Sequence, residues 1–589
     1  MTLSAAPAVI VVGGDALALN TAREICGLQG HRVTVLWHND GEFARAVETI
    51  GARFVAGAPE RFDSLQRAGV AEAVSILALS ADDQLNLRAA LRARDANPKI
   101  RIVLRQFNRT LARKIEQNLP DCSVVSLAWQ SAATYAAVAL DPTCFRGLQF
   151  PEPDGPLTGF ATRQAGECGV AGETLVAAER ALDARILAID DRTALEPDEV
   201  IGERAALVLY GMLEQLAATT PRRQAAAGKA GAAPRRRPAR ARFGSIRWRR
   251  IDPLLAGFAF GGLVLYALGA WHFHDAFGTS WLIAAYFVLS TMTTTGYGDI
   301  TPDRGNSGDI FIAMLLMLSG IVLIGIFTGF AASLLTQARW VRMQGLRRIR
   351  RRGHIVVCGA GSIGSGVIDL LLGFGRSLVV VERNPDASLI ERARDQGFDL
   401  LTGDASREDT LDLCNLGAAH SLVALTNVDT LNLEIALGGR VRNPDMPVVL
   451  RIADATFAAS IASHFAFETT FSAEALAAPT FAGLSRLPGA RGRVTFAGQE
   501  FGIGELILPA NYRDRVPDFV IPLAVAREGE LIPVRGLDEV APGDRLLMLI
   551  PRASFIEGGE TLAAVADRLF PVAVSALAVP SADTAAGDN

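Results

Sequence analysis

Cysteine is scarce in this chain, and the cysteines present are scattered. There are six in 589 residues, and no two of them have the spacing of a Cys-x-x-Cys pair. This scarcity argues against a disulfide framework and against a zinc site, so reduced thiols in a cytosolic setting are expected. The six are Cys26, Cys122, Cys144, Cys168, Cys358 and Cys414.

A secretory signal is also lacking at the N-terminus. A short alanine-rich leader without a basic residue runs directly into an apolar strand, and no cleavage site follows it. We therefore expect the first domain to stay in the cytoplasm.

Charge is sparse and unevenly distributed. Charged residues make up 20% of the chain, hydrophobic residues make up 50% and the mean hydropathy is +0.25, which favours a membrane portion. The net charge is −4, but residues 221–250 hold 11 basic residues and no acidic one.

Residues 218–250 read as a disordered basic linker. Arginines in such a run can bind nucleic acid, but here they precede an apolar span, where positive charge marks the cytoplasmic side, so no nucleic-acid partner is expected.

Two long uncharged runs predict a membrane pore unit over residues 251–338. The first, Pro253–Trp271, has 19 residues, and the second, Ile310–Ala338, has 29, against about 20 for a spanning helix. Arginines precede the first run and follow the second. Both flanks are therefore expected on the cytoplasmic side, so the chain is expected to cross twice. Neither run carries regularly spaced arginines, which argues against a voltage sensor. The predicted parts are an outer helix 251–273, a re-entrant pore helix 280–292, an inner helix 308–338 and a basic linker 339–353.

Between these runs lies the segment Thr294-Thr295-Gly296-Tyr297-Gly298-Asp299. Glycines at alternate positions allow backbone angles that let successive carbonyls point toward one ion path. A glycine-rich hairpin is the alternative reading, but the apolar flanks do not fit a hairpin. The segment matches the signature Thr-x-Gly-Tyr-Gly-Asp and resembles the pore loop of potassium channels. This resemblance implies K⁺ binding at the carbonyls of Thr294, Thr295, Gly296 and Tyr297, and a gating bend at Gly320.

Residues 354–488 begin with a strand and a complete Gly-x-Gly-x-x-Gly turn, Gly359 to Gly364. The helix after such a turn receives phosphate at its N-terminus, and Glu382, at the end of the next strand, is placed to hold ribose hydroxyls. We expect a Rossmann-like domain that binds a nucleotide. The sequence leaves open whether this is NAD(H) or ATP/ADP.

Residues 1–140 predict a second Rossmann-like domain with a degraded turn. Asp15 and Ala18 replace the second and third glycines, and Leu36 and Trp37 stand where a ribose-binding carboxylate is expected. Since an aspartate repels a pyrophosphate, this domain is expected to bind no nucleotide. Residues 141–217 predict a small α/β appendage whose role the sequence does not indicate.

The two domains repeat at a constant offset of 346 residues, which pairs Gly13 with Gly359, Asn86 with Asn432 and Arg105 with Arg451. Both resemble RCK domains, the regulators of potassium conductance. The resemblance implies ligand-site roles for Gly359, Gly361, Ser362, Ile363, Gly364, Glu382, Arg383, Asp404, Ala405 and Arg451. It also makes residues 489–552 a TrkA-C-like subdomain, followed by a C-terminal segment and disordered tail, 553–589. One RCK-like domain lies before the pore here, whereas familiar members carry theirs after it.

Taken together, the sequence predicts two Rossmann-like α/β RCK domains flanking an all-α two-helix pore unit with a re-entrant loop. The resemblance implies a potassium-selective channel gated by a nucleotide, a homotetramer with an octameric RCK ring, and no enzymatic activity. It further implies multi-pass insertion in the inner (plasma) membrane, in contact with lipid, with both termini in the cytoplasm. The alternatives are a membrane-anchored NAD-dependent oxidoreductase and an RCK-type regulatory protein with a non-conducting pore.

Overall fold

A computed structural model describes residues 7–28, 31–38, 40–151, 155–219, 253–303, 305–343, 349–467, 469–508 and 519–552. The chain forms two compact units, one of residues 1–222 together with 347–589 and one of residues 223–346. The predicted linker 218–250 falls outside the described residues from 220 onward, and so does the predicted tail 553–589.

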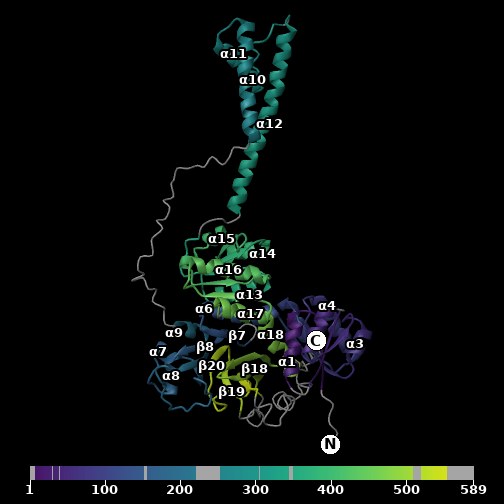
Figure 1. Ribbon diagram of the computed structural model, residues 1–589, viewed down its shortest axis with the longest axis vertical. Coiled ribbons are helices and arrows are strands. Elements are labelled where there is room, and N and C mark those ends of the chain that lie inside the picture. Colours follow the sequence, from purple (N-terminus) through teal and green to yellow (C-terminus); the bar gives the residue numbers. More distant parts are fainter. Residues whose placement is uncertain are drawn as a thin grey trace, which may run out of the picture. The chain divides into compact units, whose positions relative to one another are not determined.

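The first unit contains two six-stranded parallel sheets with the same strand order (Figure 1). In the first copy the order is β3-β2-β1-β4-β5-β6, and in the second copy it is β13-β12-β11-β14-β15-β16. Alternate residues of the central strand β1 enter different cores: Val9 and Val11 enter one, and Ile10 and Val12 enter the other. Each sheet is therefore covered on both faces, which explains the near-continuous apolar strands in the sequence.

The first copy runs from β1 to α6. Its strands are β1 (Ala8–Val12), β2 (Arg32–Trp37), β3 (Arg53–Ala56), β4 (Ala73–Ala78), β5 (Arg101–Arg105) and β6 (Cys122–Val125). Its helices are α1 (Ala16–Gly27), α2 (Gly41–Thr49), α3 (Phe62–Ala68), α4 (Asp83–Ala96), α5 (Arg109–Asn118) and α6 (Leu127–Leu140).

The second copy runs from β11 to α18. Its strands are β11 (Ile355–Cys358), β12 (Leu378–Glu382), β13 (Asp399–Thr402), β14 (Ser421–Ala424), β15 (Val448–Arg451) and β16 (Thr470–Phe471). Its helices are α13 (Ser362–Gly373), α14 (Ala387–Gln396), α15 (Glu408–Leu413), the short 3-10 helix Leu416–Ala418, α16 (Asp429–Arg442), α17 (Ala455–Phe465) and α18 (Ala473–Leu484).

The repeat predicted at an offset of 346 is confirmed by equivalent side-chain contacts. The amide Nδ2 of Asn86 donates to the carbonyls of Ser80 and Arg105, and that of Asn432 donates to the carbonyls of Thr426 and Arg451. Both asparagines are fully buried. Each amide ties together the ends of two neighbouring strands, at the edge where a ligand of such a fold binds.

Alanine at either asparagine is expected to lower stability, because it leaves two strand-end carbonyls unsatisfied, at about 1–3 kcal/mol for each buried group. The loss should be larger for Asn432→Ala. Its Oδ1 also accepts from the backbone N and hydroxyl of Thr426, whereas Oδ1 of Asn86 has no partner among the described atoms. Melting temperatures of the two variants test this, with the exposed Asn118→Ala as control. An equal, negligible shift in all three would contradict it.

The last helix of each copy packs on the other copy. Helix α6 lies against α13, where a Cβ on Gly366 would stand 3.0 Å from that of Ala132. In the reciprocal contact α18 lies in the core beside α1, and Arg101 donates from Nε to the carbonyl of Leu484 at 2.6 Å. The sequence of α6 is apolar on all sides, typical of a buried helix, but it does not indicate which surface covers it.

Two small antiparallel sheets complete this unit. The first has the order β7-β8-β10-β9 and the second has the order β17-β18-β21-β19-β20. They share one core, in which Phe160 and Tyr210 of the first sheet meet Phe501 and Leu549 of the second. The segment whose role the sequence left open therefore packs, sheet against sheet, on the predicted C-terminal subdomain.

The elements of the first small sheet and its helices are β7 (Cys144–Gln149), β8 (Leu157–Gln164), α7 (Ala165–Cys168), α8 (Leu175–Leu182), β9 (Arg185–Ile189), β10 (Ala206–Met212) and α9 (Leu213–Thr219). Those of the second sheet are β17 (Ala490–Phe496), β18 (Gln499–Ile507), β19 (Ile521–Arg527), β20 (Glu530–Pro533) and β21 (Arg545–Pro551).

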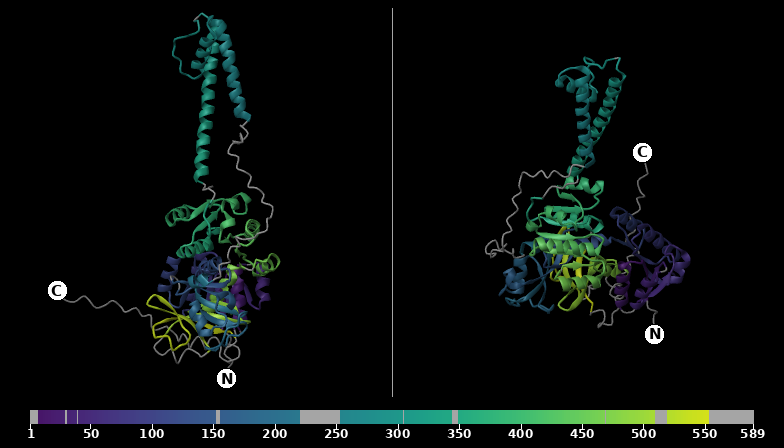
Figure 2. Two further views of the ribbon diagram at one scale, coloured as in Figure 1. Left: turned by 90° about the vertical axis from the view of Figure 1, so that its left-hand side faces the viewer. Right: turned by 45° about the horizontal axis from the view of Figure 1, so that its top comes forward.

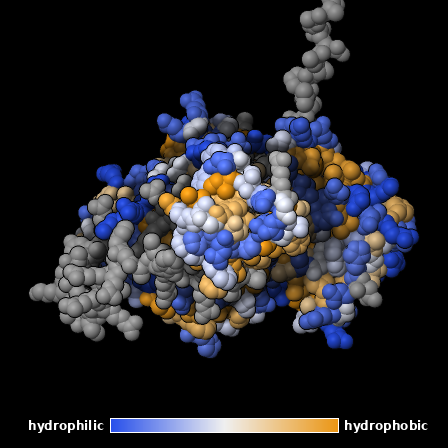
Figure 3. Space-filling view, turned by 90° about the horizontal axis from the view of Figure 1, so that it is seen from above, coloured by the Kyte–Doolittle hydropathy of each residue, from blue (hydrophilic) through white to orange (hydrophobic). Residues whose placement is uncertain are grey.

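The second unit consists of three helices, α10 (Pro253–Phe277), α11 (Trp281–Met292) and α12 (Ser307–Met343). Figure 2 shows the short α11 beside one end of the two longer helices. A core that includes Phe273, Phe287 and Leu316 joins all three. Many other apolar side chains of α10 and α12 are exposed, and apolar residues also form patches in the view from above (Figure 3).

The observed bounds differ from the predicted ones at several helix ends. Helix α10 continues to Phe277 rather than ending at 273, and α11 begins at Trp281 with Ser280 as its N-cap. Helix α12 continues to Met343 through part of the predicted linker, because arginine and glutamine are good helix formers. Among the described residues, one helical segment, Ser307–Gly329, is long and apolar enough to cross a membrane.

Candidate functional site

The loop after α11 is held against the end of that helix. The backbone N–H of Thr294 donates to the carbonyl of Thr291 at 3.2 Å. Those of Thr295 and Gly296 both donate to the carbonyl of Ser290, at 2.9 and 3.1 Å. Carbonyls that a helix end leaves free are thereby satisfied, and the loop starts from a fixed point.

Every second residue of this loop has a left-handed backbone. The φ angle is +59° at Thr294, +47° at Gly296 and +75° at Gly298, and neither Thr295 nor Tyr297 has a positive φ. Alternating handedness places successive carbonyls on one side of the chain and successive N–H groups on the other. A row of carbonyls on one side is what a cation filter requires.

Of the three aromatic residues of α11, Tyr286 contacts the loop. Its hydroxyl donates to Asp299 Oδ2 at 3.0 Å, and its ring is stacked parallel to that of Tyr297, with centroids 6.4 Å apart. Phe287 instead packs on Phe273 within the helix core. The third, Trp281, stacks on His274 of α10. Tyr286 is therefore the aromatic residue of α11 that holds the loop.

Gly320 lies where α12 touches the end of α11. A Cβ at this position would stand 1.9 Å from the carbonyl oxygen of Met292, so only glycine permits the contact. Gly325 and Gly329 have no neighbour within 4 Å among the described residues. A further contact joins α10 and α12, where His272 Nε2 lies 2.8 Å from Asp309 Oδ1.

The first unit holds a cavity of about 790 Å³ at the carboxyl edge of the second copy's sheet. Nine of the ten residues predicted for the nucleotide site line it; Gly364 does not and instead supports the loop from behind. The nine are Gly359, Gly361, Ser362, Ile363, Glu382, Arg383, Asp404, Ala405 and Arg451.

The glycine loop leaves room for a ligand only because its glycines have no side chains. Gly359 has a φ of +96°, and a Cβ on Gly364 would stand 2.0 Å from the carbonyl oxygen of Gly359. Gly361 begins α13 without a side-chain cap, so the first N–H groups of the helix face the cavity unblocked. Such a helix start attracts phosphate through its N–H groups and its dipole.

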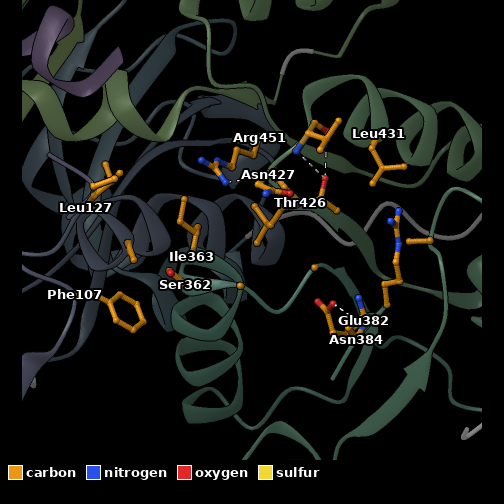
Figure 4. A pocket seen from close by; sticks show the side chains of 18 of the residues that line it. Phe107, Leu127, Ser362, Ile363, Glu382, Asn384, Thr426, Asn427, Leu431 and Arg451 are labelled. Atoms are coloured by element: carbon orange, nitrogen blue, oxygen red, sulfur yellow. Dashed lines mark hydrogen bonds between the residues drawn. The ribbon is translucent and has the colours of Figure 1, made fainter. Parts of the chain in front are cut away.

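Two carboxylates lie beside this loop. Glu382 Oε2 accepts from the backbone N–H of Ala360 at 2.8 Å, which holds the carboxylate across the loop from the helix start (Figure 4). Burial would raise the pKa of Asp404, but hydrogen bonds from Ser406 and the nearby Arg383 outweigh it, and the net pKa lies below its usual value. Both groups suit hydroxyl ligands, since an ionised carboxylate accepts hydrogen bonds and repels phosphate.

Arg451 supplies positive charge to the cavity. Its Nη2 pairs with Glu474 Oε1 of α18 at 3.1 Å, and its Nε is buried without a hydrogen-bond partner among the described residues. An unsatisfied buried donor costs about 1–3 kcal/mol, which an anionic ligand would offset. The loop, the carboxylates and this arginine together fit a nucleotide.

In the first copy, side chains fill the equivalent place. Asp15, at the position of Gly361, caps α1 and pairs with Arg105, the equivalent of Arg451, at 2.7 Å. The Trp37 indole lies so close to Gly14 that a Cβ there would be 2.0 Å from Nε1. The charge that would meet a phosphate is therefore already neutralised by the protein.

The sequence did not indicate that the first copy contributes to the cavity of the second. The loops after β4, β5 and β6 supply one wall, which includes Phe107 and Leu127. These residues carry no motif, and they are about 250 residues from the glycine loop in the chain. The packing of α6 on α13 and of α18 beside α1 brings them there. The first-copy lining residues are Ala81, Asp83, Arg105, Gln106, Phe107, Ser126, Leu127 and Ala128.

Protein-family models match parts of both compact units. The TrkA-N domain model matches residues 9–125 and again residues 355–469, and the ion channel model matches residues 254–337. Potassium channel protein 1 of Methanocaldococcus jannaschii is 24% identical over 196 residues, covering 32% of this chain and 55% of its own length. The voltage-gated potassium channel Kch of Escherichia coli is 26% identical over 215 residues, covering 34% and 50%. The chain therefore carries two TrkA-N domains and an ion channel domain, and it is similar to prokaryotic potassium channels.

The chain spans about half the length of the two relatives just named. Among solved structures, the GsuK channel aligns with 96% of this chain and 80% of its own, at 14% identity and a TM-score of 0.47. The GsuK RCK domain structure aligns with 96% of each chain at 15% identity and a TM-score of 0.46.

Proposed function

We propose that this protein is a potassium-selective channel whose opening is controlled by a nucleotide bound to the second RCK copy. The observation that carries the proposal is the loop Thr294–Asp299, with its alternating backbone directly after a short apolar helix. A single chain offers one row of carbonyls, and four rows are needed to surround an ion, so the conducting form is a homotetramer. The names of the potassium-channel relatives point to the same ion.

In the proposed topology α10 and α12 cross the inner (plasma) membrane and α11 with its loop re-enters it between them. Apolar side chains exposed along α10 and α12, such as Phe260 and Phe311, would then face lipid. The two RCK copies of each chain lie in the cytoplasm with both termini, and four chains form a ring of eight copies. Gly320 either permits bending of α12 or keeps α12 against α11, and its contact with Met292 favours the second role.

For gating, NAD(H) or ATP/ADP bound at Gly359–Gly364 would stabilise one arrangement of the RCK ring over another. The effect on the pore is limited by the difference in affinity between the two arrangements, typically about 5- to 150-fold. The membrane-anchored oxidoreductase is less well supported. Glu474 is already paired with Arg451, and Asp83 accepts from Gln106, so neither is free to act as a catalytic base in the cavity.

Cation flux into liposomes that contain the purified protein tests the proposal. We expect potassium influx to exceed sodium influx at least about tenfold, because a carbonyl filter replaces the hydration shell of potassium better than that of sodium. Equal flux of the two ions would reject selectivity, and no flux at all would favour the non-conducting regulatory protein. Consumption of NAD(H) by the same preparation would instead favour the oxidoreductase.

A further inference from the structure

The cavity in the first unit extends beyond the residues of the second copy that would hold a mononucleotide. Figure 4 shows Glu382 at one end, Ser362 and Ile363 in the middle, and Phe107 at the opposite end. The end near Glu382 belongs wholly to the second copy, whereas the end near Phe107 is built by the first copy. The site of one copy is therefore completed by the other.

This order of groups corresponds to the parts of a dinucleotide. A carboxylate after the second strand holds the ribose of one nucleoside, and the helix start holds the pyrophosphate. The part of the ligand beyond the pyrophosphate would then extend away from Glu382, toward Phe107 and Leu127. A mononucleotide ends at its phosphates and does not reach this wall.

The wall at the far end is suited to a planar ring. Phe107 is 54% exposed although it lines a cavity, and it is the second residue after β5. The backbone N–H of Phe107 and the amide of Gln106 both donate to Asp83 Oδ2, at 3.0 and 2.7 Å. The loop is therefore fixed while the phenyl ring remains free to stack, and stacking on an aromatic side chain is a common way to bind a base.

We infer that the cavity selects a dinucleotide over a mononucleotide, and that Phe107 of the first copy stacks on the second ring of the ligand. This inference rests on the proposed nucleotide site in the second copy and specifies its ligand class. The first copy, which has lost its own nucleotide loop, thereby becomes a specificity element for its neighbour. Ligand binding also spans the contact between the copies, where α6 meets α13.

Titration calorimetry of the purified full-length protein with NAD⁺ and with ADP tests the inference. The Phe107→Ala variant is expected to lose about 5- to 150-fold in affinity for NAD⁺, the range for one stacked base, and less than twofold for ADP. The matched control is Phe62→Ala, since Phe62 lies on α3 of the same copy, is 50% exposed and does not line the cavity. It should leave both affinities unchanged.

Different results overturn different claims. If the wild-type protein binds neither ligand, the proposed nucleotide site fails and the inference fails with it. If both ligands bind but Phe107→Ala changes neither affinity, or lowers both equally, the nucleotide site stands and the dinucleotide assignment falls. Gly361→Asp, which places a carboxylate at the helix start as Asp15 does in the first copy, should abolish binding of both ligands; retention of NAD⁺ binding would overturn the assumed position of the pyrophosphate.

Discussion

Replacement of Gly298 by alanine is expected to reduce potassium flux at least about tenfold. Gly298 has a φ of +75°, and an L-residue with a side chain pays about 1–2 kcal/mol for a left-handed conformation. In a tetramer this strain occurs four times around one ion path. Since Thr294 already adopts a positive φ, the loop has little capacity for further strain. The carbonyl row should turn away from the path, and the ion would lose the oxygens that replace its hydration shell.

The measurement is potassium flux in liposomes, with assembly checked by size-exclusion chromatography. Gly261→Ala is the control, because Gly261 lies on α10, has an ordinary φ and has no neighbour within 4 Å among the described residues. The control should conduct like the wild type. Full, potassium-selective flux in a correctly assembled Gly298→Ala protein would show that this backbone does not form the filter.

The second large effect is expected at Gly364, where alanine should weaken nucleotide binding. The added Cβ would lie 2.0 Å from the carbonyl oxygen of Gly359, and that oxygen belongs to the backbone, so it cannot rotate away. Either α13 or the loop must shift, and the phosphate would lose charge-assisted hydrogen bonds at about 1.5–3 kcal/mol each. An affinity loss of roughly 10- to 100-fold follows, and added nucleotide should no longer change channel opening.

Calorimetry measures the affinity, and single-channel recording with nucleotide on the RCK side measures the opening. The control is Gly373→Ala at the other end of α13, which has no neighbour within 4 Å among the described residues. If Gly364→Ala binds normally, the ligand does not use this loop. If it loses binding but the nucleotide still changes opening, a second nucleotide site controls the gate.

Much of the candidate site was predictable from short stretches of sequence. The filter loop and the glycine turn each depend on backbone conformations that glycine permits. The glycines that meet this requirement lie within a few residues of one another and are therefore visible in the sequence. Glu382 was found because it ends the strand after the turn, and the duplication followed from a constant offset. In each case the cause lies within one strand-turn-helix unit, or in a comparison of two such units.

The wall formed by Phe107 and Leu127 was not predictable in this way. An exposed phenylalanine after a strand has no local signature of ligand binding, and the equivalent residue of the second copy is Ala453. The contacts of Gly320 and Phe287 were not predictable for the same reason. Gly320 is required by the carbonyl of Met292, and Phe287 by the ring of Phe273, and both contacts join different helices.

The sequence by itself determined the two Rossmann-like sheets, the apolar helices and the chemistry of both loops, because strand periodicity, helix length and glycine conformation are local properties of the chain. Only the tertiary structure decided that α6 and α18 are exchanged between the copies and that the degraded first copy completes the cavity of the second. Helices α6 and α18 are apolar on nearly every side, so burial is specified but the covering surface is not. Which surfaces meet depends on shape complementarity between segments about 230 to 460 residues apart, and no local pattern records it.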